Sequence, residues 1–354
     1  MPCSSSSSNL IKLIKKLSRA HGVSGFEQEI REIVKSELEE LVDEIKIDAM
    51  GNLFAIRNGN DLKLMVAAHI DEIGFVVKSI DEKGFIRLTP IGGWFSQIAL
   101  AQRVILYGNK GKIFGVIGSK PPHLMRDEER KKAVEIKDMF IDVGAENREE
   151  VLDLGIEVGT PVAIDREVVE LTNNRITGKA FDNRVGVAVM IEAIKRTKSE
   201  ATIHAVATVQ EEVGLKGART SAFAIEPNAA IAIDTCVAAD FPGSESAHMD
   251  IMLGKGAVIT VVDASGRGLI TSPLVLRWLR ETADKHGIKY QLEVADGGTT
   301  DATAISLTRS GIPAGVVSVP ARYIHSPVEV VDLRDVENAT DLIARALETA
   351  GNYF

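Results

Sequence analysis

Apolar residues recur with helical spacing near the start of the chain. They form one stripe, with three lysines on the opposite side, and this is the usual pattern of a surface helix that packs on a domain. A membrane surface would accept the same stripe, but packing is the commoner use. A second helix is predicted to begin at Ser24, because Glu27 follows three residues later as in a capping box. The first stripe consists of Leu10, Ile11, Ile14 and Leu17.

Short apolar runs after these helices predict strands at residues 45–47, 53–56 and 64–68. The third run is continuously apolar, which is typical of a strand buried on both faces of a sheet. It leads directly into His69.

The pattern changes over residues 74–164. Strand-like runs such as FVVKSI and GKIFGVIG alternate with glycine turns, and long helical periodicity is missing. We predict a small β-barrel or sandwich here. The charged segment 126–132 has little to bury, so it is predicted to be a mobile loop of that domain.

Strands and helices alternate again after residue 164, which indicates an α/β fold. The sequence thus predicts one mixed-sheet α/β catalytic domain, residues 1–73 and 165–354, interrupted by a β-rich domain at residues 74–164. The predicted helices of the second half are 183–195, 273–286 and 333–349, and the strands are 203–209, 229–233 and 314–319.

Composition removes several classes of protein. A net charge of -9 over 354 residues opposes a nucleic-acid binder, which needs a concentrated basic face. We find no stretch of roughly 20 apolar residues, so no membrane partner is expected. Cys3 and Cys236 are the only cysteines, which excludes a disulfide framework and favours the cytoplasm. The serine-rich start lacks the pattern of a leader and is predicted to be disordered or vector-derived.

Acidic and imidazole side chains follow four predicted strands. The carboxyl edge of an open α/β sheet is where ligands bind, so these side chains are expected to meet there. Each alone is more often a turn former or a helix cap. Together, two histidines and several carboxylates without cysteine suit a hydrolytic pair of divalent ions. The residues are His69 and Asp71, Glu211 and Glu212, Asp234, and His325.

The roles of three carboxylates at this edge can be narrowed from their positions in the sequence. Glu211 and Glu212 are neighbours, and neighbours on an extended chain point to opposite faces, so they are not expected to flank one glycosidic bond. Asp182 precedes an apolar helix and is the candidate carboxylate shared by two ions roughly 3.5 to 4 Å apart. It could also cap that helix, and both roles are compatible.

Five segments resemble the M42 metallo-aminopeptidases, the tetrahedral (TET) aminopeptidases: AHIDEIGF, GKAFDNRVG, QEEVGLKGART, DTCVAADFPG and RYIHSPVEVVD. The resemblance covers nearly the whole chain. It implies two divalent metal ions per subunit, zinc first and cobalt as an alternative. By resemblance, His69 and Asp234 would hold one ion, Glu212 and His325 the other, and Asp182 would bridge them, with Asp71 orienting His69 and Glu211 acting as general base.

The resemblance also implies an activity and an assembly. The chain would release N-terminal residues from short peptides by attack of a metal-bridging water, inside a hollow dodecamer built from dimers through residues 74–164. A di-metal carboxypeptidase or an N-acyl amino acid deacylase is the alternative, since the same metal chemistry cleaves either bond. A non-catalytic assembly protein is the third reading, which the metal-free Glu211 opposes. The preferred N-terminal residue stays open.

The glycine-rich loop 295–305 has no nucleotide-binding pattern. We predict that Gly297, Gly298 and Thr299 form part of a substrate wall before a helix that begins near Thr300 or Asp301, and a plain turn with a helix cap is the alternative. His248 is predicted to be structural or exposed. Cys236 is predicted to be a buried thiol that holds no metal.

Overall fold

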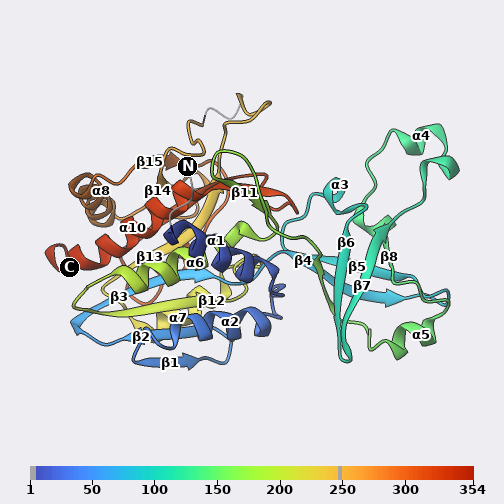
Figure 1. The fold of residues 1–354 in the computed structure, drawn as a ribbon, viewed down its shortest axis with the longest axis horizontal. Helices are drawn as coiled ribbons and strands as arrows, with labels where there is room; N and C mark the ends of the chain where they lie inside the picture. The colour runs from blue at the N-terminus through green and yellow to red at the C-terminus, as the bar shows by residue number, and fades with distance from the viewer. Residues whose placement is uncertain (1–4, 246–248) are drawn as a thin grey trace.

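The computed structural model describes residues 5–245 and 249–354, with the side chains of residues 5–8 left aside. It has two parts that lie side by side, a large mixed sheet covered by helices and a closed β-barrel (Figure 1). The predicted fold class, a mixed-sheet α/β fold with a β-barrel-like part within it, is confirmed.

Within the described residues, the large sheet has eleven strands, and its main path runs β1-β2-β12-β3-β13-β16-β17-β11-β10, with β14 joining β16 to β15. Four central strands, β12, β3, β13 and β16, are parallel to one another. The strands are β1 (Glu44–Ile47), β2 (Leu53–Arg57), β3 (Asn60–His69), β10 (Val169–Glu170), β11 (Arg175–Gly178), β12 (Ala201–Thr208), β13 (Ala229–Val237), β14 (Ala257–Val262), β15 (Tyr290–Val294), β16 (Ala314–Arg322) and β17 (Glu329–Asp332).

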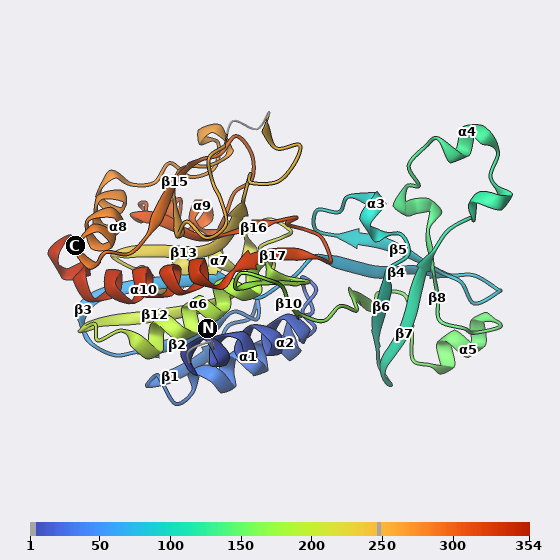
Figure 2. The ribbon, with the colours of Figure 1, turned by 45° about the horizontal axis from the view of Figure 1, so that its top comes forward.

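Helices cover both faces of this sheet, and α6, α8 and α10 can be followed across one face in Figure 2. That face and its helices, α1 and α2 included, share one apolar core, and the opposite face shares a second core with α7 and α9. The helices are α1 (Ser5–Arg19), α2 (Gln28–Leu38), α6 (Phe181–Arg196), α7 (Lys216–Ile225), α8 (Pro273–His286), α9 (Asp301–Ser306) and α10 (Leu333–Thr349).

Strand β3 shows how alternation directs the site. Leu64, Val66 and Ala68 pack in the first core, whereas Met65 and Ala67 pack in the second. The strand is therefore buried on both faces, as predicted. Because side chains alternate along a strand, His69 continues the row of Met65 and Ala67, on the face of α7 and α9.

The barrel is closed by strands in the order β4-β5-β8-β7-β6-β9 around its own apolar core. The segment 126–132, predicted to be a loop, contains the helical turn α4, where the carboxylate of Glu129 accepts a hydrogen bond from the Arg126 backbone N–H (2.7 Å). The elements are β4 (Gly74–Ile80), β5 (Ile86–Ile91), β6 (Arg103–Gly108), β7 (Gly111–Gly118), β8 (Phe140–Asp142), β9 (Pro161–Ile164), α3 (Ser96–Ala99), α4 (Asp127–Arg130) and α5 (Arg148–Asp153).

Two predictions near the N-terminus are wrong. Helix α1 begins at Ser5, inside the serine run that was expected to be disordered, and residues 1–4 lie outside the described part. Helix α2 begins at Gln28, not at Ser24. The expected capping box does not form, because the Ser24 hydroxyl donates to Asp71 (2.6 Å) and the Glu27 carboxylate accepts from the Gly25 N–H (2.7 Å).

The later helices match the expectation closely, since α8 and α10 have the predicted bounds. Among the described residues, none of the helices combines the length and the apolar character that crossing a membrane requires.

Candidate metal centre

The carboxyl edge of the four parallel strands gathers the predicted residues. His69 is the last residue of β3 and pairs in register with Thr208 at the end of β12. The next strand, β13, carries Asp234, which pairs with Ser318 of β16. Loops that follow β12 and β16 then add Glu211, Glu212 and His325. Strand order alone thus places side chains from distant segments side by side.

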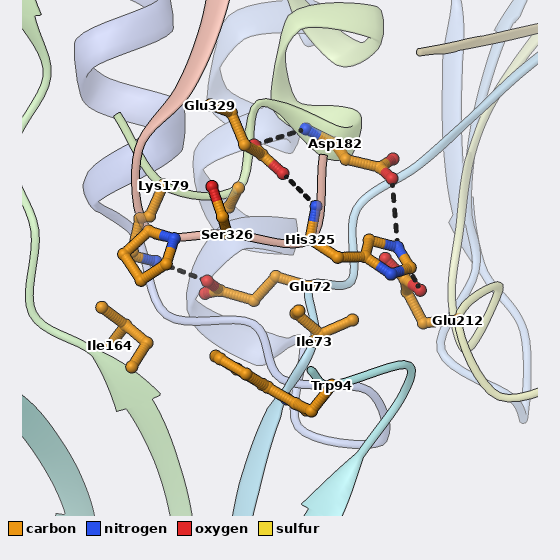
Figure 3. Close-up of a pocket in the computed structure, with 12 residues that line it drawn as sticks. Glu72, Ile73, Trp94, Ile164, Lys179, Asp182, Glu212, His325, Ser326 and Glu329 are labelled. Carbon is orange, nitrogen blue, oxygen red and sulfur yellow. Dashed lines mark hydrogen bonds and ion pairs between the residues drawn. The ribbon is translucent and has the colours of Figure 1, made fainter. Parts of the chain in front are cut away.

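Asp182 lies between the two histidines. One carboxylate oxygen, Oδ1, is 3.2 Å from Nε2 of His69, and the other, Oδ2, is 3.3 Å from Nε2 of His325. His69 Nε2 is also 3.6 Å from Asp234 Oδ1, while His325 Nε2 is 3.2 Å from Glu212 Oε2. Figure 3 shows the Asp182, His325 and Glu212 side of this arrangement.

Among the described residues, the donor atoms form three overlapping groups, and the members of each group lie within 4.8 Å of one another. Two groups contain Asp182 and one histidine: His69, Asp182 and Asp234, and Asp182, Glu212 and His325. The third consists of His69, Glu211 and Glu212. Asp182 is common to the first two. Oε1 of Glu212 is buried and has no hydrogen-bond partner among the described residues, which suits an atom that faces a cation. Carboxylate and imidazole donors without thiolate suit borderline divalent ions.

Asp71 contacts the His69 ring on the side away from the proposed metal ions. Its carboxylate is fully buried, and Oδ1 lies 3.4 Å from Nδ1 of His69, on the side of the ring opposite Asp182. The same carboxylate accepts the backbone N–H groups of Glu211 (3.0 Å) and Glu212 (3.2 Å) and the hydroxyl of Ser24. Asp71 therefore fixes both the histidine ring and the loop that carries two acidic residues.

One argument from the sequence about Glu211 and Glu212 is wrong. The pair is not part of an extended strand, because β12 ends at Thr208 and a turn follows. Gln210 has a left-handed backbone (φ 55°), and both carboxylates approach His69 within the same 4.8 Å group. Neighbouring residues on a turn need not point to opposite faces, so the two acids share the site.

The irregular first turn of α6 assigns to two residues the two roles that the sequence allowed for Asp182. Regular helical geometry begins only after Asn183, and the Asn183 side chain accepts a hydrogen bond from the Gly186 N–H (3.1 Å). Asn183 thus caps the helix. The Asp182 carboxylate instead points toward the histidines.

Burial and mutual charge shift the pKa values of these groups. Burial alone would lower the pKa of His325, but Asp182 and Glu212 raise it to about 11. Burial also opposes protonation of His69, yet Glu211, Asp182, Asp234 and Asp71 together raise the pKa of His69 well above its usual value. For Glu211, burial raises the pKa well above the ordinary glutamate value; His69 opposes this shift, and nearby acids add to it. In this setting a bound cation would displace protons.

Two buried acids were not predicted as parts of the site. Glu329 accepts the backbone N–H of His325 (2.9 Å) and of Asp182 (3.1 Å), as Figure 3 shows, so one carboxylate ties two loops together. Asp301, expected only as a helix start, is buried beside the Thr208 hydroxyl, and burial raises its pKa to about 7. The sequence offered only a weak signal for either, namely an acid just after a glycine-rich or histidine-bearing loop.

A groove extends from the histidines over the sheet. The predicted wall residues Gly297, Gly298 and Thr299 line it, and α9 begins at Asp301 with the Thr300 side chain as its cap. Cys236 lines the groove too and is buried, as predicted. The prediction for His248 lies outside the described residues.

Comparison with known proteins gives a consistent match. Residues 51–342 match the family model described as M42 glutamyl aminopeptidase. A putative aminopeptidase of Acetivibrio thermocellus is 42% identical over 340 residues, which are 96% of this chain and 98% of that protein. A lysyl aminopeptidase of Pyrococcus furiosus is 38% identical, over 95% of this chain and 96% of that protein.

Solved structures agree with this match. An aminopeptidase from Desulfurococcus kamchatkensis is 47% identical and superposes with a TM-score of 0.93, over 97% of this chain and 95% of that one. A TET1 peptidase of Pyrococcus horikoshii, which can assemble into a tetrahedron or a large octahedral shell, is 36% identical with a TM-score of 0.85, over 96% and 99%.

Proposed function

The chain belongs to the M42 glutamyl aminopeptidase family, and we propose that it releases N-terminal residues from short peptides with the help of two divalent metal ions. One observation carries the metal part of the proposal: the two oxygens of Asp182 lie close to two different histidines. A carboxylate in that position can serve two ions at once.

The residues present fit such a pair of ions. His69 and Asp234 would hold one ion, Glu212 and His325 the other, and Asp182 would contribute to both. Bound there, the ions would polarise the scissile carbonyl and activate a water molecule for attack. Zinc is the first choice, and cobalt would accept the same donors.

The remaining side chains have separate tasks. Glu211 has Oε2 3.9 Å from Nε2 of His69 and groups with His69 and Glu212, but not with Asp182, so we assign it to proton transfer and not to the ions. It would take a proton from the attacking water and pass it to the leaving amine. Asp71 would keep His69 oriented and the Glu211 backbone in place through the contacts described above.

We further propose that the chain forms homo-oligomers through its barrel. Phe114 and Val116 on β7 are exposed apolar residues, at 66% and 48%, and exposed apolar residues of this size suit a protein contact. The shells formed by the Pyrococcus horikoshii TET1 peptidase support an assembled state of this kind, with a dodecamer built from dimers as the expected form. Light scattering that finds only monomers at assay concentrations would refute this.

A panel of peptides with free or blocked ends tests the activity. The metal-loaded protein should cleave a peptide with a free N-terminus, should spare its acetylated form, and should accept an amidated C-terminus. Cleavage that tolerates acetylation but needs a free C-terminal carboxylate would instead support a carboxypeptidase. Release of the acyl group alone would support a deacylase.

A further inference from the structure

The groove also carries acidic side chains outside the four parallel strands. Glu293 of β15 and Asp263, just after β14, line it together with Thr260 of β14. In register, Glu293 pairs with Thr260, Thr260 with Val316, and Val316 with Ala232, two residues before Asp234. The acids thus lie on the same sheet as the metal centre, in a neighbouring row.

The charges along the groove do not balance without a ligand. Asp182, Glu211, Glu212 and Asp234 surround the histidines, and two divalent ions would neutralise those four carboxylates. Further acids line the groove beyond them, whereas lysine and arginine are missing from its lining in the described part of the chain. A ligand cation is therefore the natural counterpart of these additional acids.

The two acids are buried. Glu293 is 6% exposed, and its carboxylate accepts the Thr260 hydroxyl on Oε2 (2.7 Å). Asp263 is 4% exposed, and its Oδ2 is buried without a partner within residues 5–245 and 249–354. Burial raises the pKa of both carboxyls, so each would gain from a cation. Buried carboxylates are normally paired, which points to a missing cationic partner.

We propose that Glu293, with Asp263 beside it, binds the cationic side chain of an N-terminal lysine or arginine, so that the enzyme prefers basic N-terminal residues. This inference rests on the proposed aminopeptidase activity. The strand order favours the side chain over the α-amine. Neighbouring strands are about 4.8 Å apart, so β15 lies roughly 14 Å from β13. The α-amine must stay next to the scissile carbonyl at the metal centre, whereas a lysine side chain extends away from it.

Aminomethylcoumarin derivatives of lysine, arginine, leucine and norleucine test this with the metal-loaded, full-length enzyme. Norleucine has nearly the shape of lysine but no ammonium group. The wild type should show a higher kcat/KM for lysine than for norleucine. Glu293→Gln keeps an acceptor for Thr260 but removes the charge, so the lysine-to-norleucine ratio should fall roughly 10- to 100-fold, as for a hydrogen bond to a charged group. Asp263→Asn should shift the ratio in the same direction, and it serves as the second variant if Glu293→Gln does not fold.

The matched control is Asp284→Asn, which removes one negative charge from an exposed position of α8 and should leave the ratio unchanged. A wild type that prefers norleucine overturns the proposal without any variant. Equal losses for lysine and norleucine in Glu293→Gln would assign the carboxylate to the α-amine or to the fold, and a lower metal content would assign it to a metal ion. Failure of the wild type to cleave any of the four substrates would instead refute the proposed activity.

Discussion

The two histidines of the candidate metal centre are held in different ways. His69 ends a buried strand, is 2% exposed, and has Asp71 behind its second ring nitrogen. His325 lies in a loop with a left-handed backbone (φ 60°), its side chain is 35% exposed, and Glu329 holds its backbone N–H, not its ring. We call His69 and Asp234 the His69 half of the centre, and Glu212 and His325 the His325 half. In the first half the histidine is held through its side chain, and in the second through its backbone.

The difference suggests a division of labour between the halves. A buried ring between two carboxylates loses little freedom on binding an ion, so the His69 half should set the geometry of the centre. An exposed ring on a loop can adjust, so the His325 half should bind its ion less firmly. Asp182 couples the two, because each of its oxygens approaches one histidine.

Substitutions of the neighbouring acids Glu211 and Glu212 should have the largest effects, and these effects should differ in kind. Glu211→Gln should retain two ions but lower kcat by about 10²- to 10⁴-fold, because an amide cannot take the proton. Glu212→Gln removes a charged donor next to His325 (3.2 Å), so it should lower the metal content of that half. Stopped assays and elemental analysis of the same preparations measure both. Normal turnover in a metal-replete Glu211→Gln protein would remove Glu211 from the mechanism.

The second contrast concerns the two supports. Asp71→Asn should weaken metal binding or activity by about 10- to 100-fold, because the His69 ring loses its charged partner. Glu329→Gln should weaken binding of the ion beside His325. The Glu329 carboxylate accepts the backbone N–H groups of Asp182 and His325, and the NH2 of a glutamine cannot accept either of them. Competition with a fluorescent chelator measures each affinity.

Ser24→Ala is the control for Asp71, since it removes one donor to the carboxylate and leaves the contact with His69. Its effect should be only a few-fold. Because Asp71 also accepts the Glu212 N–H, Asp71→Asn should have a smaller effect on the ion beside His325. The proposed separation into two halves is wrong if Asp71→Asn weakens that ion more than the ion beside His69.

The hydrophobic pattern was readable from the sequence, and it predicted many of the helices and strands. The bounds of α8 and α10 followed from periodicity, and the strands leading to His69 and Asp234 followed from apolar runs with acidic or imidazole ends. Such features depend on residues close together in the chain, so local rules suffice.

Asp71 was predicted as the partner of His69, but the long-range contacts of Asp71 and the role of Glu329 could not be predicted in this way. Asp71 reaches Ser24 and Glu211, which are 47 and 140 residues away, and Glu329 reaches Asp182 across 147 residues. The turn that brings Glu211 and Glu212 into one group depends on a left-handed residue, Gln210, that no glycine announces. Contacts between distant segments are set by packing, and periodicity does not contain them. The roles proposed for the site residues themselves remain predictions.

Stepwise removal of metal is the mildest test of the difference between the halves. In the metal-free centre the pKa of His325 is about 11, so a proton competes with the ion, and metal affinity should fall as the pH is lowered. His69 faces the same competition, because its pKa is raised as well, but its burial and Asp71 oppose release. Dialysis against a chelator should therefore remove one equivalent before the other, and faster at pH 6 than at pH 8. Anomalous scattering from half-depleted crystals should find the remaining ion beside His69, whereas simultaneous loss of both ions at either pH would show that the halves are equivalent.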